Sequence, residues 1–251
     1  MTSLARVREA IIACERCPRL RRHCLKVARD KVRRFRGESY WGRPVPGFGD
    51  RRARLLIVGL APAAHGGNRT GRVFTGDDSG NWLYGTLHQH GFASHEQSVS
   101  RHDGMRLLDC YVTAAARCAP PQNRPTRAEL DRCRPYLAAE IRLLRRVVVV
   151  VVLGRVAHEA WLRASGWWDR LGPCARPAFS HGGETRLPDG AVLITSYHPS
   201  RQNTQTGRLT RKMWLAVFRR ARALVGKRLV GNPLAARPGH RYDDRRAGRA
   251  T

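Results

Sequence analysis

Acidic residues are scarce in this sequence. Its 251 residues include 47 Lys and Arg but only 19 Asp and Glu, which leaves a formal net charge of +28 at pH 7. This excess is larger than solubility requires and favours a polyanionic partner, of which nucleic acid fits best. A genome that favours Arg codons explains part of the excess, but not the whole of it.

Long apolar runs are also missing. The longest, Val147–Leu153, has the length of a strand, and no run of eighteen or more apolar residues is present that could cross a bilayer. The N-terminal residues lack the apolar core and the cleavage site of a secretory signal. We therefore expect a cytoplasmic, nucleoid-associated protein without a membrane partner.

The remaining pattern predicts an α/β/α sandwich with an open, mostly parallel sheet. Short apolar runs predict strands at 55–58, 110–114 and 147–153 and in the segment AVLITSYHPS. Helical spacing predicts helices at 4–13, 79–90, 126–144, 155–164 and 209–225, and an Arg-rich helix and linker before residue 36. Alternating strands and helices indicate one domain over residues 1–225. Residues 226–251 are rich in Gly, Pro and Arg, and we expect a basic, disordered tail there.

Four of the seven cysteines are spaced as metal ligands. Cys14 and Cys17 form a C-x2-C pair, and Cys118 and Cys133 supply two more thiols near Arg and Pro. Four thiolates can hold a zinc ion or a 4Fe-4S cluster, and the spacing does not distinguish them; four unrelated buried thiols are the alternative. A reducing compartment argues against a disulfide framework. The other three cysteines lack such partners, and we expect Cys110, in a predicted strand, to be a core residue.

The first polar loop follows the first predicted strand. It reads GLAPAAHGGNRTGRVFTGDDSG, from Gly59 to Gly80, and combines small residues with two arginines, one phenylalanine and two adjacent carboxylates. Glycine lets backbone amides approach a ligand closely, and Phe74 offers a flat face to a nucleobase. A phosphate-binding loop is the alternative, but neither a G-x-G-x-x-G nor a Walker sequence is present. The loop therefore favours a nucleobase pocket.

The second polar loop, SYHPSRQNTQTGR, follows the last predicted strand. It places His198 at a carboxyl strand end, where α/β folds bind ligands, and Pro199 stiffens the turn. An imidazole held there can stabilise negative charge that develops during a reaction. A purely structural histidine is an equal alternative on these residues alone.

Together these segments resemble the uracil-DNA glycosylase superfamily, most closely family five, also called the B type. The resemblance covers about residues 10–222 and has three motifs: the loop at 59–77, SYHPSRQN at 196–203, and the four cysteines with RCAPPQNRPT. It implies a three-layer α/β/α sandwich with a central four-stranded parallel sheet, and a 4Fe-4S cluster in preference to zinc on Cys14, Cys17, Cys118 and Cys133. It also implies a monofunctional DNA glycosylase of base excision repair, which flips out a damaged nucleotide and cleaves its N-glycosidic bond.

The resemblance assigns roles to single residues. Phe74 would stack on the extruded base, and His198 would donate a hydrogen bond to the O2 atom of the base. Asp77 would steer water or stabilise the oxocarbenium-like sugar, whereas Asp78 should point elsewhere. Related families carry a polar residue after the proline of the first motif, and family five shares the alanines found here. The residues expected to line the base are Gly59, Ala61, Ala63, Ala64, Phe74 and Asn203.

DNA contacts would come from both loops. Arg69 and Arg72 would meet phosphates, although a solvated surface role is an equal alternative for each arginine. The segment after His198 would enter the minor groove, through Ser200, Arg201 and Gln202. The expected partner is double-stranded or single-stranded DNA that contains deaminated bases, and the expected state is a monomer.

One departure from the family bears on substrate choice. Four residues before Cys118, where relatives that recognise uracil carry an asparagine, this sequence has Ala114. Loss of that amide would relax selectivity, so the expected substrates include hypoxanthine and xanthine besides uracil. The alanines also keep a second hypothesis open, a non-catalytic iron-sulfur or zinc protein that binds DNA through a degenerate pocket. A zinc-containing nucleotide-binding enzyme is a third.

Overall fold

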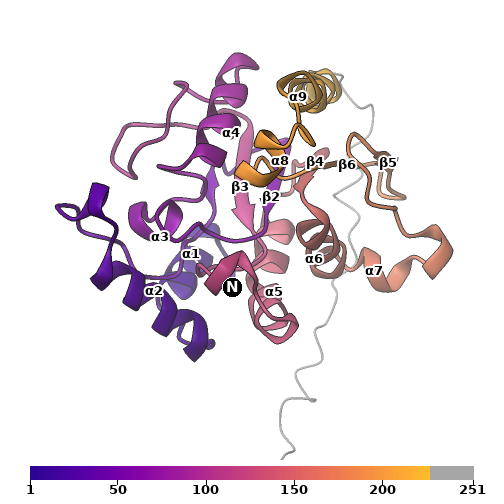
Figure 1. Ribbon diagram of the computed structural model, residues 1–251. Helices are drawn as coiled ribbons and strands as arrows, with labels where there is room; N and C mark the ends of the chain where they lie inside the picture. Colours follow the sequence, from indigo (N-terminus) through magenta and orange to yellow (C-terminus); the bar gives the residue numbers. More distant parts are fainter. Residues whose placement is uncertain (227–251) are drawn as a thin grey trace, which may run out of the picture.

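The β-branched apolar runs form the centre of a sheet. The structure, a computed structural model, describes residues 1–226, which contain one sheet of six strands in the order β1-β3-β2-β4-β6-β5 (Figure 1). The central strands β3, β2, β4 and β6 pair in parallel, whereas β1 and β5 pair antiparallel at the two edges. The strands are β1 (Phe48–Gly49), β2 (Leu55–Gly59), β3 (Cys110–Ala114), β4 (Val149–Leu153), β5 (Glu184–Arg186) and β6 (Val192–Ser196).

The sheet therefore differs from the implied four-stranded parallel sheet. Both additional strands are too short to produce an apolar pattern. β1 has two residues, and β5 has three polar residues that are exposed or half-exposed. β5 returns to β6 through a turn in which Gly190 adopts a φ of 82°, a conformation that suits glycine. The prediction is thus corrected to a mixed sheet whose antiparallel strands lie at the edges.

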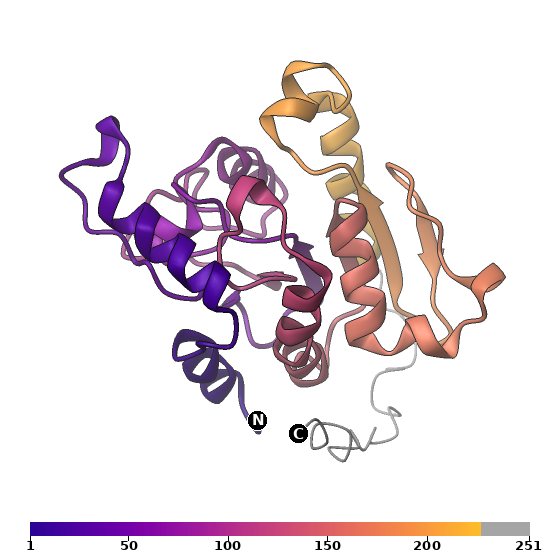
Figure 2. The ribbon, with the colours of Figure 1, turned by 60° about the horizontal axis from the view of Figure 1, so that its bottom comes forward.

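Alternate strand residues face different helix layers. Leu55 and Ile57 pack with residues of α4 and α9, whereas Leu56 and Val58 pack with residues of α5 and α6. Figures 1 and 2 show these two helix pairs on opposite sides of the sheet. The longer helices are α1 (Leu4–Ile12), α2 (Pro18–Asp30), α4 (Asp78–Gln89), α5 (Arg127–Leu143), α6 (Arg155–Ser165) and α9 (Arg211–Gly226). The three layers that the resemblance implied are present.

Helix boundaries follow local sequence signals. The five helices predicted with explicit bounds lie within two residues of those bounds. Thr126 and Glu129 form the predicted capping box of α5, in which each side chain bonds the backbone of the other residue. The helices of four or five residues were not predicted, because one turn shows no periodicity. They are α3 (Gly67–Thr70), α7 (Trp167–Arg170) and α8 (Arg201–Gln205).

Two sequence expectations concern the periphery of the molecule. None of the helices within residues 1–226 is long and apolar enough to span a bilayer. The basic tail predicted at 226–251 lies outside the described residues, apart from Gly226, which ends α9.

Candidate active site

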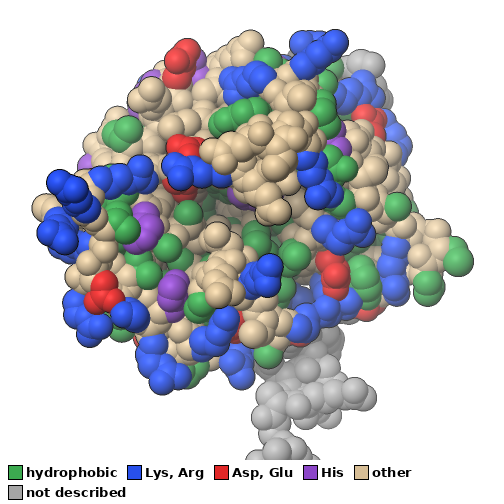
Figure 3. Space-filling view, in the orientation of Figure 1, with side chains coloured by type: hydrophobic (Ala, Val, Ile, Leu, Met, Phe, Trp, Pro, Cys, Tyr) green, Lys and Arg blue, Asp and Glu red, His purple; other side chains and the backbone are tan. Residues whose placement is uncertain are grey.

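The two polar loops meet at the carboxyl edge of the parallel strands. The first loop follows β2 and the second follows β6, and both strands pair in parallel with β4 between them. The rings of Phe74 and His198 stack there, with their centroids 5.8 Å apart and their planes 27° apart. Figure 3 shows this face hollowed beside α8, with Lys and Arg side chains spread around the hollow. Phe74 and His198, from two separate loops, therefore lie in one site.

The position of Phe74 depends on two glycines. Its backbone has a φ of 52°, which is unusual for a residue with a side chain, and its ring is buried. A Cβ atom at Gly59 would lie 2.6 Å from Cζ of the ring, and one at Gly80 would collide with the carbonyl oxygen of Phe74. The hydroxyl of Tyr84 donates to the carbonyl of Val73 at 3.1 Å and holds the chain beside the ring.

His198 is held by its neighbours and is neutral at physiological pH. Burial lowers the pKa of its imidazole to about 4. Its carbonyl accepts a hydrogen bond of 2.8 Å from Nδ2 of Asn203, so this amide fixes the loop. Ser200 caps α8 by accepting a hydrogen bond from the backbone of Asn203. We predicted Asn203 as a base contact; the structure places its amide on the loop that carries the histidine.

Asp77 is the N-cap of α4. Its Oδ1 accepts the N–H of Gly80 at 2.8 Å, and its Oδ2 faces Gly66 in the first loop. Burial raises the pKa of Asp77, and the charge of Asp78 adds to this, while hydrogen bonds from the backbone and the charge of Arg69 oppose it. The carboxylate therefore has a structural role in addition to any chemical role, and it lies between the start of α4 and the first motif.

Asp78, the residue after Asp77, points outward. Asp78 forms an ion pair with Arg201, and both side chains are exposed. The hydroxyl of Ser79 donates to the carbonyl of Pro199 at 2.9 Å. These two contacts join the start of α4 directly to the second loop, and they use Arg201, for which we predicted a DNA contact. Gln202 is exposed on α8.

The alanines of the first motif follow β2 at the same edge. Ala61, Ala63 and Ala64 are partly exposed, and the carbonyl of Ala63 accepts the N–H groups of Gly66 and Asn68. Gly59 pairs with Ala114 in the register of β2 and β3. Of these small residues, Gly59 lies directly against the ring of Phe74.

We expect the substitution Gly66→Ala to displace the carboxylate of Asp77. The new methyl group would occupy the space of Oδ2, so the excision rate should fall about tenfold, as small misplacements of reacting groups do. Gly85→Ala in α4 is the matched control, because the nearest atom would lie 3.8 Å from its Cβ and alanine favours helices. Single-turnover rates and melting temperatures of both variants test this; equal rates in both would contradict it.

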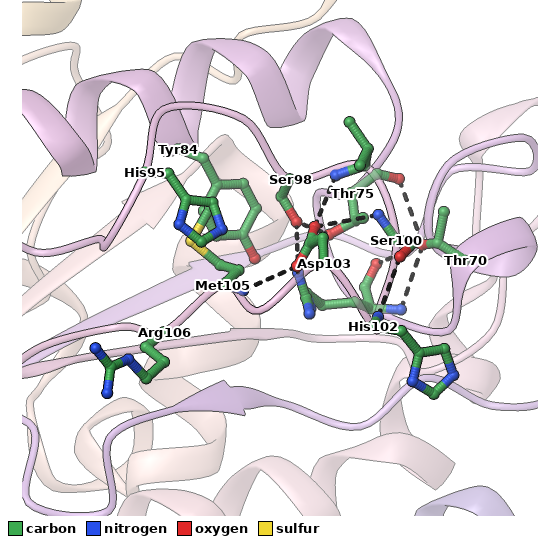
Figure 4. Close-up of polar contacts among 12 residues, drawn as sticks. Thr70, Thr75, Tyr84, His95, Ser98, Ser100, His102, Asp103, Met105 and Arg106 are labelled. Carbon is green, nitrogen blue, oxygen red and sulfur yellow. Dashed lines mark hydrogen bonds and ion pairs between the residues drawn. The ribbon is translucent and has the colours of Figure 1, made fainter.

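A buried polar network supports the first loop from behind. Arg72 donates to the hydroxyl of Ser98 and to Oδ1 of Asp103, both at 2.8 Å, and the hydroxyl groups of Thr75 and Ser98 lie 2.7 Å apart. Figure 4 shows Asp103 and Ser98 pointing toward Thr75 from the segment after α4. Partial burial acts to raise the pKa of Asp103, but hydrogen bonds from backbone N–H groups and Arg72 together lower it below its ordinary value. No sequence pattern revealed this segment, because its polar residues lack periodicity.

The predicted phosphate contacts of Arg69 and Arg72 do not match their placement. Both are buried, with 7% and 4% of their surfaces exposed. Arg69 pairs with Glu38, donates to the carbonyl oxygens of His65 and Gly76, and stacks on an aromatic ring. Both guanidinium groups are therefore used to hold the loop, and we do not retain them as DNA contacts.

The four cysteines of the predicted metal site come from three segments. Cys17 caps α2, Cys118 follows β3 and Cys133 lies in α5; all three are buried, and Cys14 is partly buried. Burial, together with the smaller effects of Cys17 and Cys14, raises the pKa of Cys133 to about 11, although its contacts with Arg117 act to lower it. Within residues 1–226, no three His, Cys, Asp or Glu side chains are arranged to hold a single metal ion.

The remaining cysteines differ from one another. The prediction that Cys110 is a core residue is confirmed, because it is fully buried in β3. Cys24 packs with Cys118 in a small buried cluster and donates to the carbonyl of Ala119, which its isolated position in the sequence did not indicate. Cys174 is exposed.

Comparison with known proteins agrees with the motifs. The family model of the uracil DNA glycosylase superfamily matches residues 46–222. A type-5 uracil-DNA glycosylase of Thermus thermophilus is 52% identical over 218 residues, which are 87% of this chain and 96% of that protein. A protein of the same name from Mycobacterium bovis is 47% identical over 225 residues, which are 89% of this chain and 82% of that protein. One from Pyrobaculum aerophilum is 45% identical over 216 residues, which are 86% of this chain and 91% of that protein. This chain therefore belongs to the uracil DNA glycosylase superfamily and, within it, to the type-5 group.

Proposed function

We propose that this protein is a monofunctional DNA glycosylase of base excision repair, which hydrolyses the bond between uracil and deoxyribose in DNA. Its similarity to type-5 uracil-DNA glycosylases supports this activity. The observation that carries the proposal is the contact between Phe74 and His198 at the carboxyl edge of the sheet. An aromatic face and a neutral imidazole lie together there, and a planar leaving group that becomes negatively charged needs both.

Different side chains would act on the base and on the sugar as the N-glycosidic bond breaks. As the bond breaks, its electron pair moves to the base, and an N–H of neutral His198 can donate to the oxygen that gains charge. The sugar becomes positively charged, and the carboxylate of Asp77 can stabilise it or orient the attacking water. The proposed partner is double-stranded or single-stranded DNA of the nucleoid that contains deaminated bases, on which the protein acts as a monomer.

Oligonucleotides test this activity. The protein is incubated with strands that carry uracil, hypoxanthine or xanthine and then treated with alkali, which breaks a strand wherever a base has been removed. Breaks at uracil support the proposal, and intact strands favour the non-catalytic DNA-binding protein. A strand without damage and a His198→Ala preparation control for nuclease and for a contaminating glycosylase.

The lowered pKa of His198 predicts how excision depends on pH. A histidine with an ordinary pKa loses its neutral form below about pH 6.5, whereas His198 stays neutral down to about pH 4. The unfolded chain takes up this proton first, so stability falls as the pH drops from 6.5 toward 4. We expect single-turnover excision to persist at pH 5.5 in protein that remains folded. A loss of the excision rate with a midpoint near pH 6.5 would contradict this, provided that the Asp77→Asn variant, which lacks the second titratable group, shows the same midpoint.

We further propose that Ala114 broadens the range of bases. It is fully buried at the end of β3 and pairs with Gly59, and it is Gly59 that lies against the ring of Phe74. A methyl group there cannot select a pyrimidine edge by hydrogen bonding, so hypoxanthine and xanthine should also be removed. Ala114→Asn should lower the ratio of hypoxanthine to uracil excision about tenfold; an unchanged ratio would exclude this role.

We also propose that Cys14, Cys17, Cys118 and Cys133 hold a 4Fe-4S cluster, with zinc as the alternative. The burial of three of these thiols, and the contributions of Cys14 to the raised pKa of Cys17 and of Cys17 and Cys14 to that of Cys133, support a shared site. A cluster spreads its four thiolates over four iron atoms, so they need not converge on one point as zinc ligands do. Its role would be to hold α2, α5 and the end of β3 together. Broad visible absorbance with bound iron and sulfide supports the cluster, and a colourless protein with one bound zinc supports the alternative.

A further inference from the structure

Two arginines at the carboxyl edge remain available for a ligand. Arg155 begins α6 and Arg208 lies between α8 and α9, and both are exposed. Among residues 1–226, neither forms an ion pair with a carboxylate, whereas Arg201, Arg127 and Arg163 all do. Neither guanidinium group is therefore neutralised by a direct carboxylate contact within the described chain.

Aromatic rings hold both guanidinium groups. That of Arg155 lies over Phe179, 5.5 Å from the ring centroid, and that of Arg208 lies over Tyr197 at 4.8 Å. The two rings contact each other, with their centroids 6.2 Å apart. Stacking on a ring restricts the rotamers of an arginine while its N–H groups stay free, which lowers the entropy lost when it binds an anion.

The aromatic pair is itself fixed in place. Nδ1 of His181 accepts the backbone N–H of Tyr197 at 3.2 Å, and Nε2 of His181 donates to the carbonyl of Met213 at 3.3 Å. These bonds tie the segment before β5 to the end of β6 and to α9. The ring of His158, on α6, packs against Phe179 with centroids 5.8 Å apart.

Both arginines flank the loop that carries His198. A Cβ atom on Gly154, the residue before Arg155, would lie 3.7 Å from Cβ of His198. On the other side, the N–H of Leu209, the residue after Arg208, donates to the carbonyl of Asn203, whose side chain bonds the carbonyl of His198. A strand whose nucleotide enters the pocket must place neighbouring phosphates near this loop.

We infer that Arg155 and Arg208, held on Phe179 and Tyr197, form a phosphate clamp that grips the DNA strand beside the flipped nucleotide. The inference rests on the proposed function only in taking DNA as the ligand. Guanidinium groups bind phosphate oxygens through two parallel N–H donors, so two fixed arginines can hold successive phosphates of one strand. The clamp takes the role that the sequence had suggested for Arg69 and Arg72.

Binding of DNA without catalysis tests the clamp. The probe is a fluorescent duplex with a tetrahydrofuran abasic-site analogue, whose Kd is measured by anisotropy over a series of NaCl concentrations. Arg155→Ala and Arg208→Ala should each weaken binding about tenfold and lower the slope of log K against log salt by about one. The matched control is Arg170→Ala, because Arg170 is exposed and stacks on Trp167, 5.4 Å away, in α7 after the far end of α6.

The outcomes separate the clamp from the enzyme. Equal losses of DNA affinity in Arg155→Ala, Arg208→Ala and the control Arg170→Ala would show that only net charge matters. Unchanged affinity in Arg155→Ala and Arg208→Ala would also overturn the clamp. Phe179→Leu retains both charges, so a loss of affinity in a variant with an unchanged melting temperature supports the role of the ring. If the clamp variants behave as expected but uracil is not excised, the proposed activity fails and the clamp stands.

Discussion

Replacing His198 by alanine should slow excision of uracil by about 10²–10³-fold, the effect usually seen when one donor to a developing anion is removed. The imidazole is neutral, partly buried and in contact with Phe74, and its one N–H group can donate to the base. Without it, the departing base would gain charge with no donor beside it. Single-turnover rates on a uracil-containing duplex measure the effect independently of product release.

Two controls distinguish loss of the hydrogen-bond donor from loss of DNA binding. His198→Gln keeps an N–H donor and should recover part of the rate. Anisotropy with the abasic-site duplex should show that both variants still bind DNA, because the clamp arginines are unchanged. Rates equal to that of the parent protein in His198→Ala would exclude the proposed role of the imidazole.

Replacing Asp77 by asparagine should slow excision about 100-fold while leaving the fold intact. Asparagine caps helices as well as aspartate does, so the hydrogen bond to the N–H of Gly80 can be kept. The charge is lost, and with it the stabilisation of a positively charged sugar. The rate and the melting temperature, measured together, separate the two roles of this side chain.

Comparison variants make the assignment specific to this carboxylate. Asp77→Ala also loses the cap, so it should be less stable than Asp77→Asn by about 1 kcal/mol. Asp78→Asn breaks only the exposed ion pair with Arg201 and should change the rate little. If Asp77→Asn remains fully active, the water and the sugar must be managed by other groups.

The central part of the fold could be predicted because burial leaves a pattern in the sequence. The run at 147–153 is apolar on both faces, and the structure buries all five residues of β4 between two helix layers. The capping box of α5 is equally local. The strands β1 and β5 depend on pairing with distant segments, and their own residues carry no such pattern.

The site was predicted in its aromatic and imidazole groups but not in its supports. Sequence shows that Arg69 and Arg72 are charged, but not that Glu38 and Asp103 lie beside them in the folded protein. An arginine that binds an internal carboxylate and one that binds DNA look identical along the chain. The contacts of Asp103 within its network are therefore visible only after folding.

The two contacts that join the start of α4 to the second loop have a consequence for motion. The bond from Ser79 to Pro199 and the ion pair of Asp78 with Arg201 connect segments about 120 residues apart in the chain. Neither loop can separate from the other without breaking both contacts. In native-state hydrogen exchange, the amides around Phe74 and those around His198 should therefore open as one cooperative unit, which ties the aromatic floor of the pocket to its imidazole.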